Sequence, residues 1–140
     1  MNYFQLKIIA CDKVFFDGEC ESFVFPGYDG EMAILANHEP MTTTIEVGEI
    51  RFRKPGETQW QRAIVSDGLI KVEHNLVNVL VYSAEKPEEI DKFRAQAALE
   101  RAKEQLQQKQ SLMEYHVSQA SMARAMARLR GVEKLKNLNL

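Results

Sequence analysis

Residues 76–100 read LVNVLVYSAEKPEEIDKFRAQAALE, and the pattern of apolar side chains changes within them from strand-like to helix-like. Residues 76–82 are apolar on both faces, which is typical of a central β-strand. Pro87 suits the first position of a helix, because its ring fixes φ and its missing N–H is not needed there. Glu88, Glu89 and Asp91 then add negative charge where a helix dipole favours it. We therefore expect two domains, residues 1–85 and 86–140.

The first of these segments has the two-residue period of β-strands. Phe4, Leu6 and Ile8 alternate with polar neighbours, and residues 49–53 repeat the alternation. Short turn-forming pairs separate such runs, namely Asp17-Gly18, Pro26-Gly27, Asp29-Gly30, Pro55-Gly56, Asp67-Gly68 and His74-Asn75. The pattern predicts an antiparallel β-sandwich, or flattened barrel, for residues 1–85. With a helical second domain, the chain is expected to be an α+β protein.

The second segment is composed of strong helix formers. From Ile90 to about Gln110 it contains no Gly, Pro or Thr, and Ser111 with Glu114 has the spacing of a capping box. A second helix is expected to end at about Gly131. The result is a C-terminal α-helical hairpin with two arms of about 20 residues each. The side chains expected to face each other across the hairpin are mostly alanines, namely Ala95, Ala97, Ala98 and Ala102 on the first arm and Ala120, Ala123, Ala125 and Ala127 on the second. Because alanine buries little apolar area, the hairpin is expected to open easily.

Composition and charge limit the classes of function. The chain has 140 residues, 45% of them hydrophobic, and a formal net charge of −2. Residues 1–85 carry a balance of −6 and residues 86–140 one of +4, so the helices are suited to an anionic partner. No apolar run approaches the roughly 18–20 residues of a membrane span, and the N-terminus lacks a signal-peptide pattern. A cytoplasmic protein is expected.

The motifs of common enzymes are missing from the sequence. It contains no phosphate-binding glycine loop, dinucleotide fingerprint, zinc-protease helix or hydrolase nucleophile elbow. His38, His74 and His116 are scattered, and Cys11 and Cys20 are expected to be reduced, partly buried thiols. The chain is therefore expected to act by contact and not by catalysis.

One group of helical positions is chemically distinctive. Ile90, Asp91, Arg94, Ala95 and Arg101 fall on one side of the first arm. On the second arm Arg124 and Arg128 are four residues apart and also share a side. In one interpretation these are ordinary solvated charges. In the other, the arginines converge beside Asp91 and bind phosphates, the carboxylate accepts from an amino group, and Ile90 with Ala95 forms an apolar floor for a base.

Four stretches of the sequence resemble the epsilon subunit of a bacterial F-type ATP synthase, and together they span nearly the whole chain. They are residues 29–40 (DGEMAILANHEP), residues 47–50 (VGEI), residues 66–72 (SDGLIKV) and residues 120–130, which end in Leu129-Arg130. The resemblance implies a non-catalytic rotor subunit of the central stalk in a proton-transporting complex, peripheral on the cytoplasmic face of the bacterial plasma membrane. No nucleic-acid partner is expected.

The same resemblance implies the partners of each domain. The sandwich, as a rotor-docking domain, would lie against the gamma subunit and the ring of c subunits, with Glu31 and His38 at its ring-facing end. The two-helix regulatory domain would fold against the sandwich or extend along gamma into the catalytic head. In the extended state its basic face, which includes Arg130, would meet the beta and alpha subunits and inhibit ATP hydrolysis. The membrane would be reached only through the complex.

The stretch Ile90-Asp91-Lys-Phe-Arg94-Ala95 resembles the ATP-binding motif of some members of that family. Four further positions, Glu85, Arg101, Arg124 and Arg128, match those that complete the site. The resemblance therefore implies ATP as a regulatory ligand that stabilises the folded, non-inhibitory hairpin, and it leaves open whether Mg²⁺ accompanies it. Two alternatives stay open: a structural coupling subunit that does not sense ATP, and a free-standing nucleotide-binding module.

Overall fold

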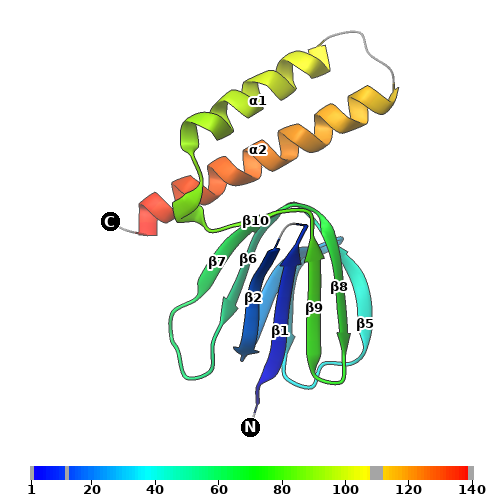
Figure 1. Cartoon of the computed structure of the whole chain (residues 1–140), viewed down its shortest axis with the longest axis vertical. Helices are drawn as coiled ribbons and strands as arrows, with labels where there is room; N and C mark the ends of the chain where they lie inside the picture. Colours follow the sequence, from blue (N-terminus) through cyan, green and yellow to red (C-terminus); the bar gives the residue numbers. More distant parts are fainter. Residues whose placement is uncertain (1, 12, 108–111, 139–140) are drawn as a thin grey trace. The chain divides into compact units, whose positions relative to one another are not determined.

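The computed structural model describes residues 2–11, 13–107 and 112–138. It divides into two compact units, Met1–Glu85 and Lys86–Leu140. Within the described residues the first unit contains ten strands in two five-stranded sheets, and the second contains two helices preceded by a short 3₁₀ turn (Figure 1). The predicted α+β class, a β-sandwich followed by a helical hairpin, is confirmed.

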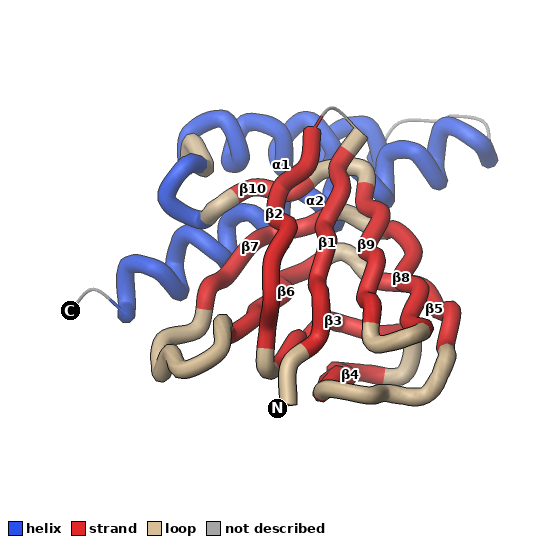
Figure 2. Tube along the Cα trace, turned by 60° about the horizontal axis from the view of Figure 1, so that its bottom comes forward, coloured by secondary structure: helices blue, strands red, loops and turns tan. Residues whose placement is uncertain are grey.

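The two sheets form the two layers of the sandwich (Figure 2). The first sheet has the order β2 (Lys13–Cys20), β1 (Phe4–Ala10), β9 (Leu76–Val81), β8 (Gly68–Glu73) and β5 (Met41–Ile45). The second has the order β10 (Ala84–Glu85), β7 (Gln61–Val65), β6 (Gly48–Arg53), β3 (Ser22–Gly27) and β4 (Gly30–Leu35). Both sheets contribute side chains to a single hydrophobic core.

The alternation in the sequence predicts which side chains fill that core. In β1 the side chains of Phe4, Leu6 and Ile8 are at most 2% exposed, and in β6 Ile50 and Phe52 are buried while their neighbours are not. Each large side chain buried in this way contributes about 1.5–3 kcal/mol relative to an exposed one. The largest others are Phe23, Phe25, Ile34, Ile45 and Ile70.

Three details of the sandwich differ from the sequence prediction. The pairing of β1 with β9 is parallel, whereas the other strand pairs are antiparallel. Strand β9 is central, yet only one of its faces is buried, since Leu80 is 55% exposed. Asp17-Gly18 does not form a turn but lies inside β2, opposite Lys7 and Leu6. Short-range patterns report turn propensity, and here pairing with β1 overrides it.

The second unit begins with a 3₁₀ turn, Pro87–Glu89, with Pro87 at its first position as predicted. The first α-helix, α1 (Lys92–Gln107), starts later, so Glu88 and Glu89 belong to the turn and not to the helix. The second helix, α2, covers Leu112–Leu138. The predicted capping box falls on Ser111 and Glu114, whose side chains lie outside the described residues.

Gly131 does not end the second helix, contrary to the prediction. It is a buried residue inside α2, which continues to Leu138. A glycine inside a helix costs only about 1 kcal/mol relative to alanine. The residues after it, VEKLKN, are mostly good helix formers, so one glycine is not enough to stop the helix.

Candidate functional site

Asp91 is the N-cap of α1. Its Oδ1 accepts a hydrogen bond of 3.1 Å from the backbone N–H of Arg94, and its carbonyl accepts one of 3.0 Å from Ala95. The bond from Arg94 satisfies a backbone donor that a helix N-terminus otherwise leaves without a partner, and the bond from Ala95 is the first regular bond of the helix. The aspartate that the sequence predicts as a ligand-binding group therefore has a local structural role at the start of α1.

Two side-chain hydrogen bonds define how α1 and α2 pair. Near the start of α1, Nζ of Lys92 donates to Oε1 of Glu133 over 2.9 Å. Near its end, Oγ of Ser118 donates to Oε1 of Gln105 over 3.3 Å. The helices are therefore antiparallel, as the hairpin in Figure 1 shows. The Lys92 ammonium group lowers the pKa of the Glu133 carboxyl, first through this hydrogen bond and then through its charge.

The buried side chains of the two helices are mostly small. Ala95, Leu99 and Ala102 of α1 are buried, and so are Ala125 and Ala127 of α2. Of the eight alanines predicted for this surface, Ala97 and Ala120 are exposed instead. Since an alanine buries little apolar area, close approach of the helices here stabilises the hairpin only weakly.

Helical geometry places four arginines along one flank of the hairpin, which we call the arginine flank: Arg94, Arg101, Arg124 and Arg128. At about 100° per residue, Arg94 and Arg101 lie on the same side of α1, next to its buried face. Arg124 and Arg128 lie on the corresponding side of α2. Arg94 and Arg101 are exposed, whereas Arg124 and Arg128 are half-buried.

The backbone positions of Arg94 and Arg101 are separated by about two turns of α1. The register given by the Lys92–Glu133 and Gln105–Ser118 bonds puts Arg124 level with Arg101. The backbone of Asp91 lies about 15 Å from this level along the hairpin axis, since an α-helix rises 1.5 Å per residue. Nη2 of Arg124 donates to Oγ of Ser121 over 3.2 Å, which holds its guanidinium on this flank. The arrangement suits an elongated anion better than a compact one.

The remaining residues predicted for the nucleotide site have different surroundings. Ala95 is 4% exposed, so its side chain leaves very little surface for a base. Ile90 is half-buried and remains available for that role. Glu85 is the last residue of β10, in the first unit. Arg130 is exposed and lies on a different side of α2 from Arg128.

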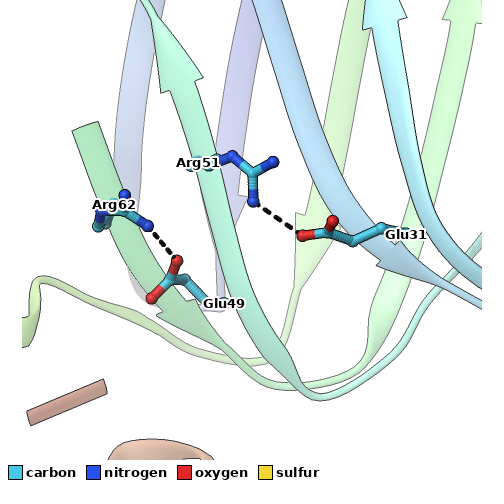
Figure 3. A network of polar contacts seen from close by, with 4 residues as sticks. All are labelled: Glu31, Glu49, Arg51 and Arg62. Atoms are coloured by element: carbon cyan, nitrogen blue, oxygen red, sulfur yellow. Dashed lines mark hydrogen bonds and ion pairs between the residues drawn. The ribbon is translucent and has the colours of Figure 1, made fainter. Parts of the chain in front are cut away.

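Glu31 and His38, predicted as partner contacts, lie at and just after β4. Oε1 of Glu31 accepts from Nη1 of Arg51 over 2.8 Å, and a second pair on this sheet, Arg62 to Glu49, spans 2.6 Å (Figure 3). His38 is half-buried, and its Nδ1 donates to the carbonyl of Glu39 over 2.8 Å. The sequence prediction missed Arg51 as the partner of Glu31, because the two positions are not neighbours in the chain.

Two findings apply to the described residues, 2–11, 13–107 and 112–138. No group of three or more His, Cys, Asp or Glu side chains in these ranges has an arrangement that could hold a metal ion. No helix in the same ranges is long and apolar enough to cross a membrane. Cys11 and Cys20 are both free thiols, and Cys11 is exposed and not partly buried as predicted.

Family models match both units of the chain. Residues 3–87 match the β-sandwich domain of the ATP synthase delta/epsilon chain, and residues 88–133 match the long α-helix domain of the same chain. The chain therefore belongs to the ATP synthase delta/epsilon family, as the resemblance predicts. As a member of this family it is a non-catalytic subunit, which confirms the prediction that it is not itself an enzyme.

Curated relatives cover nearly the full length of the chain. The ATP synthase epsilon chain of Ruminiclostridium cellulolyticum is 44% identical over 129 residues, which are 92% of this chain and 95% of the relative. The epsilon chain of Caldicellulosiruptor saccharolyticus is 40% identical over 137 residues, 98% of each chain.

A solved structure has the same fold at lower sequence identity. A chain in the Euglena gracilis mitochondrial ATP synthase, solved by cryo-EM with OSCP, F1 and the c-ring, matches with a TM-score of 0.74. It is 20% identical, and the match covers 87% of this chain and 76% of that one. This similarity supports the fold.

Proposed function

We propose that the chain is the epsilon-type subunit of a bacterial F-type ATP synthase, located in the central stalk at the cytoplasmic face of the plasma membrane. The sandwich docks on the gamma subunit and the c-ring, and the helices contact the beta and alpha subunits to inhibit ATP hydrolysis. Membership of the delta/epsilon family supports this assignment, as do relatives named epsilon chain.

We further propose that the hairpin binds ATP as a regulatory ligand, and the arginine flank is the observation that carries this proposal. Guanidinium groups bind phosphate oxygens through paired N–H donors and keep their charge at all physiological pH values. Arg94, Arg101, Arg124 and Arg128 together balance most of the charge of a triphosphate. Oδ2 of Asp91 is the carboxylate oxygen that the cap bond does not use, and it can accept from an amino group.

The weak contact between the helices makes such a ligand effective as a switch. Small side chains fill most of the surface between α1 and α2, and the Lys92–Glu133 pair at its end is more than half exposed on both sides. A ligand that binds only the closed hairpin stabilises it by about 2.7 kcal/mol at a hundredfold excess over Kd. High ATP would then keep the hairpin closed, and low ATP would let it open and inhibit hydrolysis.

Calorimetric titration of the full chain with ATP tests the nucleotide proposal. We expect saturable binding that Arg128→Ala weakens by about tenfold or more, since a hydrogen bond to a charged group is worth about 1.5–3 kcal/mol. Arg130→Ala is the matched control, because it removes the same charge two residues away from a different side of α2. An equal loss of ATP affinity in both variants would show that only the net charge of the chain matters. Absence of heat at millimolar ATP would refute the site. Titrations with EDTA and with excess Mg²⁺ decide whether the metal takes part.

Truncation after Glu85 tests the inhibitory role of the helices. The truncated chain retains the complete sandwich, whose internal contacts form a separate compact unit. When it replaces the full chain in the assembled enzyme, ATP hydrolysis is expected to rise. Hydrolysis at the level of the full chain would show that the helices do not inhibit.

A second candidate function, a coupling subunit that does not sense ATP, also has an observation in its favour. Asp91 caps α1, and Arg124 donates to Ser121, so both side chains have structural roles without any ligand. In this case the degree to which the subunit inhibits hydrolysis in the assembled enzyme would be the same at low and at high ATP. The isolated chain would give no heat on titration with ATP.

A further inference from the structure

Three distant segments of the sandwich meet at the side chain of Asn75, in the turn between β8 and β9. Its Nδ2 donates to the carbonyl of Tyr3 over 2.6 Å, and its Oδ1 accepts from the backbone N–H of Asn37 over 2.7 Å. Its own carbonyl accepts from the N–H of Gln5 over 3.2 Å. The side chain of Asn75 thus joins the start of β1 to the loop that follows β4. Tyr3 is 72 residues away from it in the sequence, and Asn37 is 38 residues away.

The turn by itself does not require this side chain. His74 and Asn75 have φ values of 51° and 60°, which is the backbone of a two-residue hairpin turn with both central residues left-handed. Glycine adopts that backbone at least as readily as asparagine. The amide of Asn75 is therefore needed for its two long-range bonds and not for the reversal of the chain.

The loop that receives one of these bonds contains residues 36–40, between β4 and β5. Asn37 has a φ of 61°, a conformation that is uncommon for a residue other than glycine, and its N–H is the group bonded to Asn75. His38 follows directly, with its ring oriented by the bond from Nδ1 to the carbonyl of Glu39. The bond from Asn75 is thus made to the residue directly before His38.

We propose that Asn75 is a positioning residue that holds the 36–40 loop in the conformation presenting His38 to the partner of the sandwich. This inference rests on the docking role of the loop in the proposed function. Asn75 acts through the Asn37 bond, while its bond to Tyr3 anchors the amide to β1. The loop is thereby held in place before docking, which removes an ordering cost from association.

Two substitutions at position 75 separate the loop bond from general stability. Asn75→Gly keeps the left-handed turn and removes both side-chain bonds. Asn75→Asp keeps an oxygen that can accept from Asn37 but loses the donor to Tyr3. His74→Gly is the matched control, because it changes the same turn without touching either bond. Midpoints of thermal unfolding report general stability in all three variants.

Two measurements are made on each variant: hydrogen exchange of the Asn37 amide by NMR, and affinity for an ATP synthase complex prepared without this subunit. In Asn75→Gly we expect exchange about tenfold faster, as for loss of a hydrogen bond worth about 1 kcal/mol or slightly more. We expect a similar loss of affinity. Asn75→Asp is expected to lie between Asn75→Gly and the unsubstituted chain, because it keeps the acceptor for Asn37 but places an oxygen where the amide donated to the carbonyl of Tyr3. His74→Gly is expected to stay near the unsubstituted chain.

His38→Ala makes the failure of the inference distinguishable from failure of the proposed function. If His38→Ala leaves the affinity unchanged, the docking role of the loop is refuted, and the functional part of the inference is refuted with it. If His38→Ala weakens binding but Asn75→Gly does not, the positioning role is overturned. Unchanged exchange at Asn37 in Asn75→Gly overturns it as well.

Discussion

Replacing Asp91 separates its two roles, because asparagine retains one of them and alanine retains neither. The N-cap bond from the Arg94 N–H to Oδ1 needs an oxygen acceptor, and asparagine caps helices about as well as aspartate. Alanine at this position costs about 1 kcal/mol of helix stability, within a range of roughly 0.5–2. About 1 kcal/mol is a fivefold change in an equilibrium, so Asp91→Ala should open the hairpin more often even without nucleotide.

The ligand role predicts a different order of effects. In Asp91→Asn an NH₂ group stands where the second carboxylate oxygen was, so an acceptor for an amino group becomes a donor. Loss of a hydrogen bond to a charged group costs about 1.5–3 kcal/mol, which raises the Kd for ATP by about ten- to hundredfold. Asp91→Ala should lose this contribution and the cap together, and therefore bind more weakly still.

Calorimetry with ATP and far-UV circular dichroism without it measure the two effects separately. We expect Asp91→Asn to keep the helicity of the unsubstituted chain while losing ATP affinity, and Asp91→Ala to lose both. If Asp91→Asn binds ATP like the unsubstituted chain, and Asp91→Ala is weaker only by the fivefold expected from the cap, the carboxylate does not contact the ligand. The reasoning on the nucleotide site would then be refuted at this residue.

Three further predictions concern stability and reactivity. Gly68→Ala should lower the free energy of unfolding of the sandwich by about 2 kcal/mol or more in urea titrations, because its Cβ would lie 1.9 Å from the carbonyl oxygen of Leu80; a loss under 0.5 kcal/mol would contradict this. Burial raises the pKa of Cys20 to about 12 from 9.0, so a thiol reagent should label only Cys11 in the native chain, and two labelled thiols would contradict it. Because the folded pKa is the higher one, the stability that Cys20 contributes is lost as pH rises from about 9 towards 12. The lowered pKa of Glu133 gives a pH dependence of stability in the opposite direction. The Lys92–Glu133 pair stabilises the closed hairpin at pH values above the ordinary glutamate pKa, and this stabilisation is lost as the pH falls through the folded-state pKa. Glu133→Gln should remove that acid dependence from NMR signals of α1.

Local features of the sequence determined most of the secondary structure. The alternation of Phe4, Leu6 and Ile8 is sufficient to identify a buried strand face, because successive side chains of a strand point in opposite directions. The spacing of Arg94 with Arg101, and of Arg124 with Arg128, likewise places each pair on one side of its helix. Pro87 marks the boundary between the units within one residue of the division in the structure.

Only the tertiary structure decided how these elements are paired. Three such features involve residues far apart in the chain. They are the parallel pairing of β1 with β9, the hydrogen bonds of Asn75 with Tyr3 and Asn37, and the alignment of Arg124 with Arg101 along the hairpin. Propensity and periodicity describe neighbours within one or two turns, so they carry no information about which distant backbone groups meet. The cap at Asp91 is a local contact, and the sequence prediction missed it because Pro87 indicated an earlier start for the helix than Lys92.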